Sequence, residues 1–180
     1  MPAAGITIAP ESLLNLTGAL VTALGAEGVA HVRDAGFATG QSLAARLRAS
    51  QAERGAPPPE ALTLAAFNAV TSTLLQHTGW GALSIDASRS AVTVLEASGW
   101  SETAARSGPG TPAPATHFTT GLLAGFFGSL AGEPLAVLEV EPAEPLSDRA
   151  RFLMGSVETV DQLFAQLERG APLSTVLAMD

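Results

Sequence analysis

The side chains best suited to recognition in this sequence are aromatic rings and imidazoles. The 180 residues include three His, two Trp and seven Phe, but no Cys and no Tyr. His77 and Trp80 lie together in "QHTGW", and Trp100 follows a predicted hairpin. Imidazole and indole N–H groups donate hydrogen bonds, while the rings pack on apolar surfaces. The three residues therefore fit a pocket with polar anchors, or alternatively a helix-capping His and two tryptophans of the core or its rim.

A second aromatic group lies in "THFTTGLLAGFFGSLAGEP", residues 116–134, which carries no charge between His117 and Glu133. The spacing predicts a helix from Thr116 to about Leu130, with two contrasting faces. One face carries small residues, which predicts close packing against another element. The other carries large residues, which predicts that it contributes to a core or forms the wall of a ligand cavity. The small face holds Gly121, Gly125, Gly128 and Gly132. The large face holds Leu122, Leu123, Phe126, Phe127 and Leu130, with Phe118 at its edge.

Motifs for catalysis are absent from the sequence. No G-x-S-x-G elbow, dinucleotide-binding fingerprint or phosphate loop occurs, and the absence of Cys excludes thiolate chemistry. His31 and His117 are interpreted as surface or capping residues. The acidic group Glu139, Glu141, Glu144 and Asp148 fits no metal-binding loop, and we interpret it as a solvated strand end and turn.

Composition restricts the function further. The chain is 47% apolar and 14% charged, as expected for a folded domain, and its net charge of −8 disfavours nucleic-acid binding. The amino terminus has no basic region before Arg33, so we expect no secretory signal. The uncharged segment is shorter than the roughly 20 residues of a membrane-spanning helix. We expect a cytoplasmic protein without a membrane span.

The elements that position these residues follow from the hydrophobic period. Gly36 and Gly40, four residues apart in a predicted helix, indicate the close approach of another backbone. The fold class is predicted to be α+β, a single domain over 1–180 with an antiparallel sheet of about four strands, in the order ααα-ββ-α-ββ-α. Predicted helices cover 10–24, about 27–54, 59–78, 116–130 and 156–169; predicted strands cover 81–86, 91–98, 135–141 and 149–155, and a long loop covers 99–115.

One pattern resembles a known family. A helix of the form G-x-L-A-G-F runs from Gly121 to Phe126, a strand with Glu139 follows, and Phe152 comes at the matching distance. This pattern resembles the 4-vinyl reductase (hydrocarbon-binding) domain, a small-ligand-binding module with the fold of the Bet-three-like subunits of the vesicle-tethering transport particle. The run "AGFATGQSLAARL" is similar to the family's Gly-x-x-x-Gly helix before the pocket.

The resemblance also implies what this chain lacks. In metal-binding members, cysteines and the glutamate hold a zinc ion. Here the cysteine positions fall on Thr116, Pro142 and Ala150, and a turn glycine falls on Leu146. Glu139 alone cannot supply a tetrahedral site, so we expect neither metal nor another cofactor.

In sensor members of the family, a His and a Trp in the general region of His77, Trp80 and Trp100 hold the hydroxyl of an aromatic ligand. The resemblance thus implies a metal-free module, homodimeric, that binds a small hydrophobic or aromatic molecule and passes its signal to a separate partner. The alternative is a dimeric protein–protein interaction scaffold with a filled core. The reductase activity in the family's name is not carried over. The candidate ligand-binding residues are His77, Trp80, Trp100, Phe118, Leu122, Phe126 and Phe127.

Overall fold

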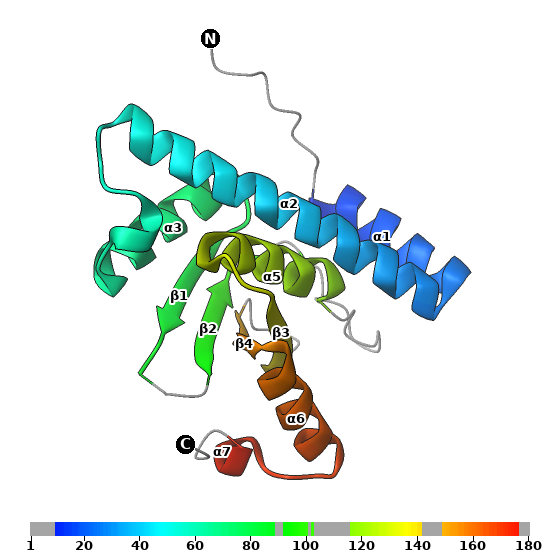
Figure 1. The fold of residues 1–180 in the computed structure, drawn as a ribbon. Helices are drawn as coiled ribbons and strands as arrows, with labels where there is room; N and C mark the ends of the chain where they lie inside the picture. Colours follow the sequence, from blue (N-terminus) through cyan, green and yellow to red (C-terminus); the bar gives the residue numbers. More distant parts are fainter. Residues whose placement is uncertain (1–9, 89–91, 101, 103–115, 142–148, 177–180) are drawn as a thin grey trace.

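A four-stranded antiparallel sheet forms the base of the fold (Figure 1). The computed structural model describes residues 10–88, 92–100, 102, 116–141 and 149–176. The strands are β1 (Ala82–Asp86), β2 (Thr93–Ser98), β3 (Leu135–Glu141) and β4 (Arg149–Ser156), in the spatial order β1-β2-β4-β3. The predicted fold class, element order and four antiparallel strands are therefore confirmed. The predicted turn after β3 and most of the predicted long loop lie outside the described residues.

Helices cover the sheet as Figure 1 shows, with α5 between the sheet and α2. The third helix begins later than predicted, because Pro59–Ala61 forms a separate 3₁₀ turn and the Thr63 side chain caps the helix, accepting from the Ala66 N–H at 3.3 Å. None of the described helices is both long and apolar enough to cross a membrane. The helices are α1 (Pro10–Leu24), α2 (Ala26–Glu53), α3 (Leu64–His77), α5 (His117–Ala131), α6 (Val157–Glu168) and the short α7 (Leu173–Val176).

Glycines bring the backbones of α2 and α5 into direct contact, as their spacing predicted. A methyl group on Gly36 or Gly40 would lie 2.2 or 2.1 Å from a carbonyl oxygen of α5. A methyl group on Gly121 or Gly125 would likewise lie 2.1 or 2.2 Å from a carbonyl oxygen of α2. The glycine face is shorter than predicted: Gly132 instead ends α5 in a left-handed conformation, with φ of 72°.

Two apolar cores lie on opposite faces of the sheet. The larger contains the large face of α5, the inner face of α3 and alternate residues of the strands, such as Leu95 and Phe152. The smaller lies under α6 and contains Val94, Leu153 and Leu163. Burial on both sides accounts for the nearly continuous apolar run in β4.

Asn68 of α3 fastens the helix to the outer edge of β1. Its Nδ2 donates to the Ile85 carbonyl at 3.1 Å, and its Oδ1 accepts from the Ile85 N–H at 2.9 Å. One side chain thus satisfies both backbone groups of Ile85 that face away from β2. This attachment fixes α3 over the larger core.

Candidate functional site

Three of the predicted ligand-binding residues form an aromatic cluster at the amino end of α5. The ring of Trp80 stacks on Phe118, with centroids 5.4 Å apart and planes inclined by 14°. Trp80 also lies 6.1 Å from Trp100 at an angle of 42°. Trp100 is fully buried, and its indole Nε1–H donates to the Ala82 carbonyl at 2.8 Å. We call Trp80, Trp100 and Phe118 the tryptophan cluster.

The next turns of α5 continue this apolar surface. Phe126 and Phe127 meet edge to face with centroids 5.1 Å apart, and Phe127 also lies 6.2 Å from Phe67 of α3. Leu122 is fully buried between the two aromatic groups along the helix. All of these residues belong to or pack against the larger core. The large face of α5 is therefore one continuous aromatic and aliphatic surface.

His77, unlike Trp100 and Phe118, is not buried. It is exposed in the last turn of α3, where its Nδ1 donates to the Thr73 carbonyl at 2.7 Å. This carbonyl lies four residues back in the same helix, so the ring forms a local contact near the helix end. The capping interpretation of His77 accounts for this position.

Two carboxylates hold the amino end of α5. Glu102, only 4% exposed, accepts from the backbone N–H groups of Phe118 at 3.3 Å and Thr119 at 2.8 Å. Glu139 of β3 accepts from the Thr116 N–H at 3.3 Å and from its hydroxyl at 2.5 Å. The first N–H groups of a helix have no partner within it, and its amino end favours negative charge. The two carboxylates satisfy both requirements next to the tryptophan cluster.

The environment of these groups shifts their protonation. Burial raises the pKa of Glu102 above its usual value of 4.5, and the charge of Glu139 acts in the same direction, whereas Thr119 and the N–H groups of α5 oppose the rise. Burial, and next the positive charge of Arg33, lower the pKa of His117, which Glu139 partly offsets. Glu102 therefore binds a proton more readily than a solvated carboxylate does.

The residues at the family's zinc positions do not fit a metal. Thr116 and Glu139 do lie together, as the resemblance implied, but they meet as a hydroxyl donor and a carboxylate acceptor. Ala150 is buried and apolar, and the sequence supplies no thiolate. No group of three or more His, Asp or Glu side chains within the described ranges is arranged to hold a metal ion. The hydrogen bond between Thr116 and Glu139 joins the residue that precedes α5 to β3.

The far end of α5 is held by a cation. Arg48 of α2 donates through Nη2 to the Ser129 carbonyl at 2.7 Å and to the Leu130 carbonyl at 3.5 Å. The same guanidinium contacts Glu60 at 2.6 Å. Positive charge at the carboxyl end of a helix complements its dipole, so both ends of α5 are stabilised by side chains from other elements. Sequence reasoning missed Glu102 and Arg48, because neither is near its partner in the sequence.

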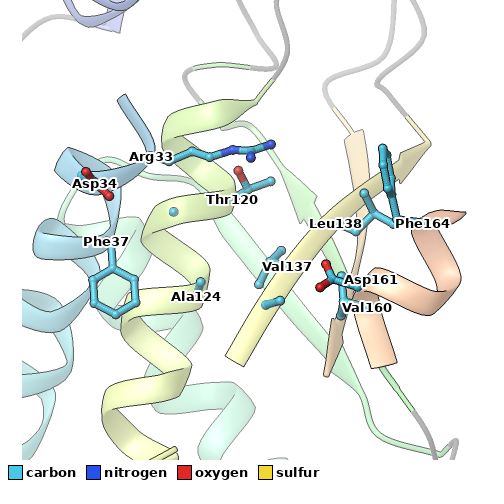
Figure 2. A pocket seen from close by; sticks show the side chains of 12 residues that line it. Arg33, Asp34, Phe37, Thr120, Ala124, Val137, Leu138, Val160, Asp161 and Phe164 are labelled. Carbon is cyan, nitrogen blue, oxygen red and sulfur yellow. The ribbon is translucent and has the colours of Figure 1, made fainter. Parts of the chain in front are cut away.

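A groove of about 410 Å³ lies on the small face of α5, away from the tryptophan cluster. Figure 2 shows its walls: Phe37 on the α2 side, Ala124 of α5, Val137 and Leu138 of the edge strand β3, and Phe164 of α6. Phe37 and Phe164 are 41% and 46% exposed, which is unusual for such large apolar rings. None of the seven predicted ligand-binding residues lines this groove; charged groups lie at Arg33, Asp34 and Asp161.

Comparisons with known proteins identify the fold. The structure resembles the phenol-responsive sensory domain of the transcription activator PoxR with phenol, with a TM-score of 0.66 and 18% identity over 93% of this chain and 84% of that one. It also resembles a vinyl-4-reductase family protein from Methanocaldococcus jannaschii, with a TM-score of 0.54 and 16% identity over 86% of this chain and 85% of that one. No protein-family model and no curated protein matches the sequence. The chain thus has the fold of the vinyl-4-reductase and phenol-sensing domains, as its sequence pattern indicated.

Proposed function

We propose that this chain is a small-molecule-binding sensory domain that holds an apolar or aromatic ligand without a metal. The observation that carries the proposal is the continuous aromatic surface on the large face of α5, from the tryptophan cluster to Phe126 and Phe127. Binding pockets for small molecules combine such walls with a few polar groups. The ligand would lie against this surface, with Trp80, Trp100, Phe118, Leu122, Phe126 and Phe127 as its contacts.

The fold comparison supports this assignment. One structure of the same fold is a sensory domain that responds to phenol. Phenol is small, aromatic and carries one hydroxyl, which matches the chemistry of an aromatic wall with few polar groups. The part of the chain that the structure describes offers no catalytic constellation, and we propose ligand binding with no accompanying reaction. The signal would pass to a separate partner.

Tryptophan fluorescence tests the proposal directly, because both tryptophans of the chain belong to the tryptophan cluster. We expect phenol, and separately toluene, to change the emission of the purified protein saturably. The variant Trp100→Phe should lose most of this change, while Phe164→Ala on the distant groove should retain it. Native mass spectrometry would report the stoichiometry and any co-purified ligand. Absence of saturable binding for both probes would contradict the proposal.

A second candidate function is an interaction scaffold, which the groove beside β3 favours. Its exposed rings Phe37 and Phe164 flank an edge strand, and Arg33 and Asp161 give it charges of both signs, which suits association with a second copy. Sedimentation equilibrium would test this function. If the groove joins two copies, Phe164→Asp should convert a dimer into a monomer without changing the binding of phenol.

A further inference from the structure

The hydroxyl of Thr71, in the middle of α3, is buried without a hydrogen-bond partner among the described residues. The residue is 0% exposed. An unpaired hydroxyl inside an apolar core is unfavourable, because it has given up its hydrogen bonds to water. Such a group in a native structure requires a partner or a role.

A local partner was available to Thr71. A helical threonine can donate to the carbonyl four residues back, and two neighbours on α3 or at its end do so. Thr73 donates to the Ala69 carbonyl at 2.8 Å, and Thr78 donates to the Leu74 carbonyl at 2.8 Å. The Thr71 hydroxyl makes no such bond among the described residues, although it is buried.

The surroundings of Thr71 are those of the proposed ligand site. Phe67 and Leu75 lie one helical turn on either side of it, on the same face of α3. Phe67 contacts Phe127, and Leu75 belongs to the same core as Phe126. Thr71 therefore lies on the inner face of α3, which packs on the core formed by the large face of α5.

A second buried hydroxyl, on Thr119, also lacks a hydrogen bond of good geometry, but a carboxylate lies beside it. It lies on α5 beside the carboxylate of Glu102, which accepts from the N–H of the same residue. For Thr71, the described residues supply no hydrogen-bond partner, and no carboxylate is bound to its backbone N–H. It is the stronger candidate for contact with a ligand.

We propose that the Thr71 hydroxyl is the polar anchor that selects the ligand, an inference that rests on the proposed function. A hydroxyl both donates and accepts, so the ligand class is a small neutral aromatic molecule with one hydroxyl or carbonyl substituent. A single neutral hydroxyl cannot compensate for the desolvation of an ionised group, so carboxylates such as benzoate are excluded. Thr71 is thus a specificity-determining residue.

The test compares phenol, toluene and benzoate on the wild type and on Thr71→Val, which keeps the shape and removes the hydroxyl. We expect the wild type to prefer phenol to toluene and not to bind benzoate. Thr71→Val should bind phenol about tenfold more weakly, the loss expected for one buried hydrogen bond, and bind toluene at least as tightly. Thr71→Ser, which keeps a hydroxyl, should preserve the preference for phenol.

Thr73→Val is the matched control, because Thr73 lies on the same helix, is exposed and already has a backbone partner. It should change neither affinity. Unchanged phenol binding in Thr71→Val would overturn the inference and leave the proposed function intact, as would an equal loss for phenol and toluene. A wild type that binds neither probe would overturn both. Thermal unfolding of each variant shows that the comparison is made on folded protein.

Discussion

The two faces of α5 are built on opposite principles. On one face, Gly121 and Gly125 remove the side chains so that the backbone touches α2. On the other, Leu122 and Phe126 are fully buried large side chains that fill the space above the sheet. The glycine face fixes the position of the helix by contact between backbones, which cannot adjust. The aromatic face consists of side chains, which can change rotamer, so it is the face that would accommodate a ligand on the proposed function.

The largest effect should come from filling the glycine face. We expect Gly125→Leu to lower the free energy of unfolding by more than about 4 kcal/mol, because even its Cβ would lie 2.2 Å from the Phe37 carbonyl oxygen. Urea unfolding followed by circular dichroism measures this loss. Gly128→Ala is the control on the same helix: its Cβ would meet the Glu133 carbonyl oxygen at 3.0 Å, so the loss should be much smaller. Equal losses in the two variants would contradict the proposed difference.

Truncation on the aromatic face should be somewhat less damaging. Phe126→Ala removes a fully buried ring and should cost about 3–4 kcal/mol, through lost burial and the cavity that remains. Phe126→Leu should cost less because it keeps part of the volume. Differential scanning calorimetry with and without phenol sharpens the comparison: on the proposed function, phenol should stabilise the wild type more than it stabilises Phe126→Leu. A larger loss for Phe126→Ala than for Gly125→Leu would reverse the ranking of the two faces.

A pH-dependent effect is expected at the amino end of α5. Because the folded-state pKa of Glu102 lies above its usual 4.5, the folded chain binds more protons than the unfolded chain in the interval above 4.5. Stability attributable to Glu102 is therefore present at low pH and decreases as pH rises through this interval. The stability difference between wild type and Glu102→Gln, measured by urea unfolding at several pH values, should change in favour of wild type as pH falls. A difference that is constant with pH would exclude this role for Glu102.

The smallest expected effect comes from replacing a glycine that makes no close contact, which tests whether the glycines of α5 matter because of their backbone contacts. Gly18, in the middle of α1, has no other atom within 4 Å of the position where a Cβ would lie. We expect Gly18→Ala to raise the stability by about 0.5–1 kcal/mol, because alanine favours the helix. A small rise in the midpoint of thermal unfolding would show this. A loss comparable to that of Gly125→Leu would mean that glycines matter here for some reason other than close backbone contact.

Local periodicity predicted much of this molecule. The strand Leu135–Glu141 and the close approach at Gly36 and Gly40 could be read from spacing alone, because each depends on a pattern within one element. The groups that hold α5 in place could not be identified from spacing within one element. Glu102 is 17 residues from the Thr119 N–H that it accepts from, and Arg48 is 81 residues from the Ser129 carbonyl, so only the folded structure brings these groups together. The unpaired hydroxyl of Thr71 is likewise invisible to sequence reasoning, since threonines in helices usually have a local partner.

The attachment of Asn68 to β1 has a consequence for how the sheet can grow. By occupying the outward N–H and carbonyl of Ile85, the asparagine amide imitates a neighbouring strand and blocks the point where another would begin to pair. The opposite edge, β3, carries the groove between Phe37 and Phe164. The two edges of the sheet therefore differ: a side chain of α3 occupies the backbone groups of the β1 edge, whereas the β3 edge lies beside the groove.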